Sequence, residues 1–243
     1  MPTRKSPKIS AILFDKDGTL IDYHRTWIPL NREAAMFAAG GQIALAEELL
    51  AAGGWDSATE RVRAGSMLAA GSTTEIAELW HNNGSPFGIR ELTRGIDQIF
   101  ARGMAAAVPV GNLRRQFAGL KERNYALGIA SSDSAASVAA LVDRFELNDL
   151  VDFVAGYDSG YGSKPSPGMF LAFCAAIECQ PGAAAVVGDN LHDMQMAESG
   201  GAGLRIAVLT GTGTVTDLTP NSDACIASIK ELDLTLASIG VAD

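Results

Sequence analysis

Residues 9–20, ISAILFDKDGTL, decide the fold, because an apolar run ends abruptly there in charged and small residues. Such a run followed by a polar turn is typical of a buried strand. Gly18 permits a sharp bend that can turn the carboxylates of Asp15 and Asp17 toward one site. Two close carboxylates can divide the work, one as an ionised nucleophile or metal ligand and the other as a proton carrier. Taken alone, an ordinary Asp/Gly turn explains the stretch equally well.

The same pattern recurs four more times along the chain. It predicts strands at residues 126–130, 153–156, 184–187 and 205–209. Apolar residues at helical spacing predict helices between several of these strands. We therefore expect an α/β fold with three layers, in which helices cover both faces of a Rossmann-like parallel sheet. Ligands bind beyond the carboxyl ends of such strands, so the polar clusters at these ends should converge.

Residues 22–103 interrupt this alternation. They contain several helical patterns and no convincing strand, and Ser72 with Glu75 has the spacing of a capping box. Residues 54–71 are the least readable part and are expected to be irregular. The prediction is a core domain of residues 1–21 and 104–243, with an all-helical cap domain of residues 22–103 inserted into it.

Composition narrows the possible partners. Of the 243 residues, 19 are Lys or Arg and 28 are Asp or Glu, and the net charge of −9 argues against nucleic acid. The longest uncharged runs, residues 34–46 and 165–177, are shorter than the roughly 18 apolar residues of a membrane span, so a membrane partner is not expected. No signal-peptide pattern follows the basic N-terminus. Cys174, Cys179 and Cys225 lack CxxC spacing and are interpreted as buried thiols, so we expect a cytoplasmic protein.

A second carboxylate pair lies in residues 188–193, GDNLHD. If a helix begins after Asp189, Asp193 lies on the same side four residues later. Several carboxylates around one point repel each other unless a cation lies among them, and hard oxygen ligands favour Mg²⁺. The alternative is a turn in which an aspartate caps a helix. His192 is interpreted as a surface or supporting residue rather than a ligand.

Two further polar residues stand between the carboxylate pairs. Ser131 ends the second predicted strand, where a hydroxyl and backbone N–H groups can bind an anion, although an ordinary N-cap serine has the same position. Lys164 precedes Pro165, and nearby prolines fix the backbone that carries its ammonium group. A lone lysine in a loop is otherwise usually solvated.

The combined order of these motifs resembles the haloacid dehalogenase superfamily of phosphohydrolases. The matching stretches are residues 15–19 (DKDGT), Ser131, residues 164–165 (KP) and residues 188–193. The chain looks most like the phosphoglycolate-phosphatase-like branch, in which a helical C1-type cap follows the first motif. The resemblance implies a phosphoric monoester hydrolase that uses Mg²⁺ and a phospho-aspartate. Its substrate would be a small phosphomonoester, similar to phosphoglycolate or a sugar phosphate.

The resemblance also implies roles for the four aspartates. Asp15 attacks phosphorus, and Asp17 protonates the leaving oxygen and then takes a proton from water. Mg²⁺ is held by Asp189, by the Asp15 carboxylate and by the backbone carbonyl of Asp17. Asp193 supports the metal or the nearby lysine without contacting the substrate.

The remaining implied roles concern substrate binding. Ser131 and Lys164 bind the phosphoryl oxygens. By their position just after the first motif, His24 and Arg25 are candidates to meet a substrate carboxylate, since arginine binds carboxylates with two hydrogen bonds. The alternative is a surface hinge with Trp27 in the core of the inserted domain. Ser132 follows Ser131 where relatives often have Asn, which puts one anion contact in doubt.

Two other functions stay open at this point. A phosphomutase of the same superfamily would return the phosphoryl group to a sugar, and residues of the cap would decide this. A non-catalytic binding or regulatory protein could retain the fold, although the intact motifs disfavour it. The sequence leaves the oligomeric state open.

Overall fold

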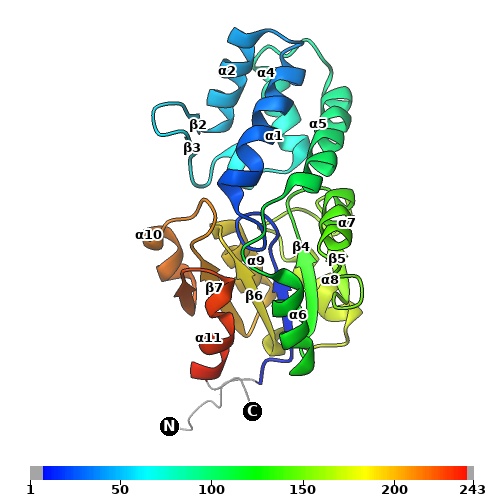
Figure 1. The fold of residues 1–243 in the computed structure, drawn as a ribbon, viewed down its shortest axis with the longest axis vertical. Coiled ribbons are helices and arrows are strands. Elements are labelled where there is room, and N and C mark those ends of the chain that lie inside the picture. Colours follow the sequence, from blue (N-terminus) through cyan, green and yellow to red (C-terminus); the bar gives the residue numbers. More distant parts are fainter. Residues whose placement is uncertain (1–7, 240–243) are drawn as a thin grey trace.

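The computed structural model describes residues 8–239 and has two lobes (Figure 1). The larger lobe is built on one six-stranded sheet in which every neighbouring pair is parallel. Its strands, in spatial order, are β5 (Phe153–Ala155), β4 (Ala126–Ala130), β1 (Ala11–Phe14), β6 (Ala184–Gly188), β7 (Leu204–Val208) and β8 (Ala224–Ile226). The predicted parallel sheet is confirmed.

Strand β1 is central because its side chains are apolar on both faces. Ile12 and Phe14 belong to one hydrophobic cluster, and Leu13 belongs to another. Within the larger lobe, the helices that contribute to the first cluster are α6 (Leu113–Glu122), α7 (Ala135–Arg144) and α11 (Leu232–Ser238). The helices that contribute to the second are α8 (Gly168–Ala176) and α9 (Leu191–Gly200). The sheet is therefore the middle of three layers, as predicted.

The sixth strand was not predicted. Strand β8 has only three residues, and it follows the short helix α10 (Val215–Leu218) at the edge of the sheet. Two of its residues are only partly buried. A strand this short has no recognisable apolar pattern, so sequence analysis could not identify it.

The smaller lobe, residues 23–103, is called the cap lobe below. Its helices are α1 (Tyr23–Ala38), α2 (Ile43–Gly53), α3 (Met67–Ala70), α4 (Thr73–Asn82) and α5 (Ile89–Gly103). The predicted capping box is present at α4: Ser72 N donates to Glu75 Oε2 at 2.7 Å, and Glu75 N donates to Ser72 Oγ at 3.4 Å. This pair satisfies backbone N–H groups that the first turn leaves free.

The cap lobe also contains a small hairpin that the sequence did not predict. Strands β2 (Trp55–Asp56) and β3 (Arg61–Val62) pair in antiparallel fashion within the stretch expected to be irregular. Asp56 Oδ1 accepts hydrogen bonds from the backbone N–H groups of Ala58 and Thr59, at 2.9 and 3.4 Å. A side chain thus closes the turn, and two-residue strands are too short to show alternation.

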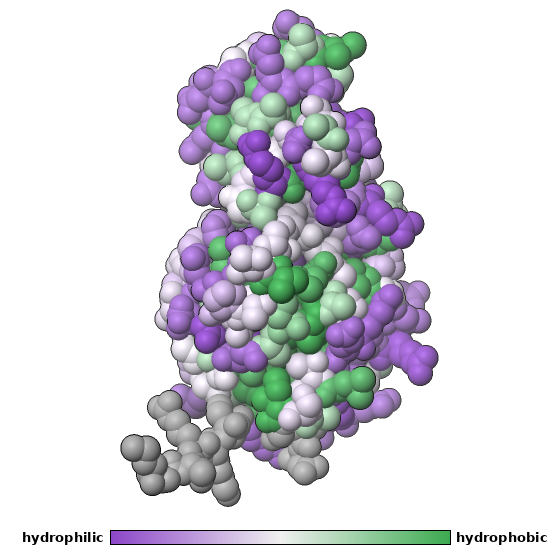
Figure 2. All heavy atoms as spheres, turned by 90° about the vertical axis from the view of Figure 1, so that its left-hand side faces the viewer, coloured by the Kyte–Doolittle hydropathy of each residue, from purple (hydrophilic) through white to green (hydrophobic). Residues whose placement is uncertain are grey.

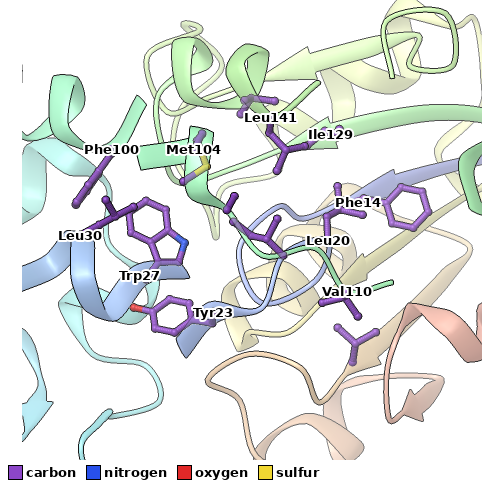
Figure 3. Close-up of a cluster of buried hydrophobic side chains, with 14 of the residues drawn as sticks. Phe14, Leu20, Tyr23, Trp27, Leu30, Phe100, Met104, Val110, Ile129 and Leu141 are labelled. Carbon is purple, nitrogen blue, oxygen red and sulfur yellow. The ribbon is translucent and has the colours of Figure 1, made fainter. Parts of the chain in front are cut away.

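The two lobes are joined by two chain segments that run side by side. Asp22 N donates to the Val108 carbonyl, and Val110 N donates to the Leu20 carbonyl, each at 2.8 Å. One hydrophobic cluster continues across this junction, with Trp27 and Phe100 on the cap side (Figure 3). The cap lobe therefore lies over the carboxyl edge of the sheet, because the chain enters it directly after β1.

The surface differs between the lobes on the face that carries α10 and α11 (Figure 2). Polar side chains prevail on the cap lobe there, while apolar side chains gather on the sheet lobe. Within residues 8–239, no helix is long and apolar enough to cross a membrane. Of the three cysteines, all free, only Cys174 is buried, whereas Cys179 and Cys225 are partly exposed. The expectation of buried thiols therefore fails for two of them.

Candidate active site

A cavity of about 60 Å³ lies between the lobes, at the carboxyl edge of the sheet. Five of the candidate residues line it: Asp15, Asp17, Lys164, Asp189 and Asp193. Asp15 and Asp17 follow β1, Asp189 follows β6, and Asp193 lies in the first turn of α9. Strands that end at one edge thus bring together side chains that are distant in sequence.

Lys164 holds two of these carboxylates. Its Nζ donates to Asp15 Oδ1 at 2.6 Å and to Asp193 Oδ1 at 2.7 Å. Burial disfavours the ammonium, but the two carboxylates together raise the pKa of Lys164. Burial raises the pKa of Asp15 to about 6, although Lys164 opposes the rise. Asp15 Oδ2 is buried and has no hydrogen-bond partner within the described part of the chain, so this oxygen is free to meet a ligand.

Three carboxylates form a cluster that is suited to a cation. Asp15, Asp189 and Asp193 each offer one oxygen, and these oxygens lie within 4.8 Å of one another. Burial, followed by the charges of Asp15 and Asp193, raises the pKa of Asp189 well above its ordinary value. A cation would remove this repulsion, and a donor set made only of oxygen favours Mg²⁺ over softer metals. The residues therefore fit a divalent metal.

Two glycines leave the space that the Asp189 carboxylate occupies. A Cβ at Gly211 would lie 1.7 Å from Asp189 Oδ2, and a Cβ at Gly18 would lie 2.6 Å from the same atom. Gly18 also has a φ of +89°, a conformation that other residues rarely adopt. The Asp189 carboxylate is held further by the backbone N–H of Thr212, which donates to Oδ2 at 2.8 Å. Its position is thus fixed before any ligand binds.

The Asp17 carboxylate makes a different set of contacts from the carboxylates of Asp15, Asp189 and Asp193. It accepts hydrogen bonds from Trp27 Nε1 at 2.5 Å, from Lys16 Nζ at 2.7 Å and from Ser131 Oγ at 3.2 Å. Burial raises the pKa of Asp17 to about 6, against the opposing charge of Lys16. A carboxyl group that titrates near neutral pH is suited to carry a proton in both directions.

Lys16 and Trp27 are site residues that sequence analysis missed. Lys16 is fully buried, and its Nζ also donates to Asp133 Oδ2 at 3.1 Å. A lysine that directly follows a buried strand is a usable signal, since a buried ammonium needs carboxylate partners. Trp27 gives no such signal, because a tryptophan on an amphipathic helix is expected to pack in the core.

Ser131 lies behind Asp17 rather than at the cavity. It is fully buried, donates to Asp17 Oδ2, and accepts from the backbone N–H of Asp133 at 3.0 Å. Its neighbours Ser132 and Asp133 line the cavity instead. The structure therefore brings the Ser131 hydroxyl to the site through Asp17, and its contact with a phosphoryl group stays a prediction.

His24 and Arg25 are not brought to the cavity. Arg25 is exposed and His24 is half-buried, and neither is among the lining residues. Burial and the nearby Arg61 lower the pKa of His24. The cap lobe lines the cavity with other residues, among them Asn31, which the sequence did not single out. His192 also lines the cavity, and its Nδ1 is buried without a hydrogen-bond partner in the described residues.

Comparison with known proteins agrees with this arrangement. Over 82 residues the chain is 35% identical to "Probable phosphatase IndB" of Dickeya dadantii (strain 3937), and this match spans 34% of the chain and 36% of that protein. Over 199 residues it is 26% identical to a phosphoglycolate phosphatase of Photorhabdus laumondii subsp. laumondii, spanning 79% of the chain and 77% of that protein.

The fold is shared with solved structures. The crystal structure of CbbY from Rhodobacter sphaeroides in complex with phosphate superposes with a TM-score of 0.70 at 23% identity, and covers 92% of this chain and 96% of that one. Residues 9–201, which include all four motifs, match the model of the haloacid dehalogenase-like hydrolases. Because this match covers most of the chain, the protein belongs to the haloacid dehalogenase-like hydrolase family.

Proposed function

We propose that the protein is a Mg²⁺-dependent phosphatase that hydrolyses a small phosphomonoester through a phospho-aspartate on Asp15. One observation carries the proposal: the buried Asp15 has one oxygen without a partner at the cavity, while Lys164 binds the other. Family membership and the phosphatase names of two relatives support it. The proposed catalytic core is residues 1–21 and 104–243, and the proposed cap is residues 22–103.

The reaction consists of two displacements at phosphorus. In the first, Asp15 Oδ2 forms a bond to phosphorus, the ester P–O bond breaks, and Asp17 gives its proton to the leaving alkoxide. In the second, Asp17 takes a proton from water, the water oxygen bonds to phosphorus, and the bond to Asp15 breaks to release phosphate. Its pKa of about 6 lets Asp17 serve both steps near neutral pH.

The remaining residues either bind the negatively charged phosphoryl group or would hold the cation that offsets its charge. Mg²⁺, when bound, supplies positive charge that offsets the negative phosphoryl oxygens. Asp15, Asp189 and the backbone carbonyl of Asp17 would hold it. Lys164 and Ser131 are the proposed phosphoryl ligands. Asp193 positions Lys164, with which it makes a hydrogen bond of 2.7 Å.

The test is phosphate release from a panel of small phosphomonoesters, with and without Mg²⁺. Asp15→Asn should reduce the rate on the order of 10³-fold or more, since an amide is a poor nucleophile. Asp143→Asn is the matched control, because Asp143 is exposed on α7. Release that needs no Mg²⁺, or that survives in Asp15→Asn, contradicts the mechanism.

Two other outcomes separate the rival functions. A phosphomutase would interconvert sugar phosphates in the presence of a bisphosphate and release little phosphate. A binding protein would be folded and inactive on the whole panel.

A further inference from the structure

The wall of the cavity that faces the phosphoryl site carries no cationic side chain. The cap lobe provides this wall through Tyr23, Trp27, Asn31, Leu68, Ile76 and Phe100, together with small residues between positions 69 and 73. The cap lobe contains no lysine, and all seven of its arginines are exposed. The part of the substrate that leaves with the ester oxygen therefore meets aromatic, aliphatic, hydroxyl and amide groups.

The opposite wall of the cavity is acidic, so it too offers no partner to a negatively charged leaving group. Asp15, Asp17, Asp133, Asp189 and Asp193 line it, and the ammonium of Lys164 already binds two of these carboxylates. A carboxylate on the leaving group would lose its hydration without gaining a cationic partner from the cap. Burying a charge without a partner of opposite charge is strongly unfavourable. The site therefore disfavours an anionic leaving group.

Asn31 supplies the amide of this wall, and the Thr73 hydroxyl is its other buried polar group without a hydrogen-bond partner in the described residues. It lies on α1, is 2% exposed and lines the cavity, and its Nδ2 has no hydrogen-bond acceptor in the described part of the chain. The amide lies close enough to Tyr23 to oppose the rise that burial causes in the pKa of that phenol. The Tyr23 hydroxyl itself donates to the Leu68 carbonyl at 2.6 Å. A buried donor without an acceptor is costly, and an oxygen of a ligand would satisfy it.

We propose that the site selects phosphomonoesters whose leaving alcohol is uncharged, with a hydroxyl or carbonyl oxygen that accepts a hydrogen bond from the Asn31 amide. Trp27 and Phe100 provide the apolar surface against which the rest of the alcohol packs; their rings meet edge to face with centroids 4.6 Å apart. The inference rests on the proposed phosphatase function and narrows its substrate class. It favours neutral sugar-like alcohols over glycolate.

His192 provides the competing explanation. Among residues 8–239, it is the other lining residue, besides Lys164, that can carry a positive charge, and its Nδ1 has no partner there. If a positively charged His192 binds the leaving group, the enzyme prefers a leaving group that carries a carboxylate. The experiment therefore includes this residue.

The test compares two esters that differ in charge and little in shape: 2-phosphoglycolate and its primary amide, 2-phosphoglycolamide. For the native protein, we expect kcat/KM to be at least about tenfold higher for the amide. Asn31→Leu should lower kcat/KM for the amide about tenfold, which is the loss of one hydrogen bond. Phenyl phosphate offers no oxygen to Asn31, so Asn31→Leu should lower kcat/KM for this ester clearly less than for the amide, and the difference between the two losses measures the hydrogen bond.

Each result has one meaning. An equal or higher kcat/KM for phosphoglycolate overturns this inference and leaves the phosphatase function standing. If His192→Gln removes that preference, the histidine reads a carboxylate. A parallel loss on the amide and on phenyl phosphate in Asn31→Leu assigns Asn31 a structural role and also overturns the inference. Failure of the native protein to hydrolyse any ester overturns the phosphatase function, and the inference with it.

Discussion

Lys16 carries its charge in a place where lysines are rarely found. Its side chain is fully buried and donates to two carboxylates, Asp17 at 2.7 Å and Asp133 at 3.1 Å. Burial opposes the charge, yet these two carboxylates raise the pKa of Lys16 above its ordinary value. The lysine thus ties the proposed proton carrier to the start of α7. Loss of this ammonium would leave two buried carboxylates facing each other.

Lys16→Met should therefore lower the free energy of unfolding by about 3 kcal/mol. In the double variant Lys16→Met/Asp133→Asn, one of the two charges is gone, so part of this loss should be recovered. Urea unfolding of the native protein, of Lys16→Met, of Asp133→Asn and of the double variant measures both effects. Lys121→Met is the control, since its ion pair with Asp152 is partly exposed and contributes less than about 1 kcal/mol. Additive losses in the double variant would contradict the coupling.

The raised pKa values of Asp15 and Asp17 predict how metal binding depends on pH. Both move from 3.8 to about 6 on folding, so between these values the folded protein binds more protons than the unfolded chain. The free energy of unfolding of the metal-free protein should accordingly fall as the pH rises through this window. Mg²⁺ requires deprotonated carboxylates as ligands. The increase in the Tm of the protein that Mg²⁺ causes should therefore be small at pH 5 and larger at pH 7.5.

Thermal unfolding with and without Mg²⁺ at the two pH values checks this dependence. Asp189→Asn, which removes a proposed ligand, should abolish the difference. The same increase in Tm at both pH values would show that the carboxylates of Asp15 and Asp189 do not bind the metal.

The sequence predicted some site residues and missed others for a physical reason. Asp15, Asp189 and Lys164 stand at the ends of recognisable strands or in a proline-fixed loop, so the local pattern makes them candidates, and the order of the motifs along the chain selects them. The contact from Lys16 to Asp133 spans 117 positions, and it depends on how β1 and β4 pair. Asn31 becomes visible only when the cap lobe is placed over the sheet. The spacing of residues along the sequence predicts neither the contact from Lys16 to Asp133 nor the position of Asn31 at the cavity.

At the scale of elements, buried strands were the easiest to predict. Strands β1, β4 and β6 are almost wholly buried, so each is a continuous apolar run that ends where the polar site begins. The hairpin β2–β3 and the edge strand β8 have two or three residues per strand, too few for a pattern. The layers could thus be predicted, whereas the short strands could not.

Gly211, in the loop after β7, is a position at which a substitution should disturb the proposed metal site and leave the rest of the fold intact. Gly211→Ala would force a Cβ to within 1.7 Å of Asp189 Oδ2. The carboxylate must then move, so Mg²⁺ affinity should fall at least about tenfold while the sheet remains folded. Calorimetric titration with Mg²⁺ measures this change. Gly182→Ala is the matched control, because a Cβ there meets nothing within 4 Å. Unchanged affinity in Gly211→Ala would remove Asp189 from the metal site.

At the scale of the whole molecule, the lobes are linked by a hydrogen bond in addition to the one from Trp27 to Asp17. Tyr157, in the loop after β5, donates to Asp97 Oδ2 on α5 at 3.0 Å. Burial raises the pKa of Tyr157 to about 12, so the phenol keeps its proton and remains a donor at neutral pH. The bond favours the arrangement in which the cap lobe covers the cavity.

Tyr157→Phe should weaken this closed arrangement. We expect KM to rise about threefold and kcat to change less than about twofold, because chemistry takes place in the closed form that substrate still selects. Steady-state kinetics on the best ester checks this. Tyr161→Phe is the control, since Tyr161 is 44% exposed. An equal effect in both variants would mean that the loop, rather than the link between the lobes, is responsible.

The two chain segments that join the lobes side by side have an evolutionary consequence. Backbone hydrogen bonds join residues 20–22 to residues 108–110, so the inserted segment leaves and rejoins the sheet lobe at one point. The separation of its ends is therefore independent of its length, and a longer or shorter segment adds little entropy cost to the connection from β1 to β4. Segments of this kind are readily exchanged. The cap lobe can therefore change in length and sequence while the residues at the carboxyl edge of the sheet keep their positions.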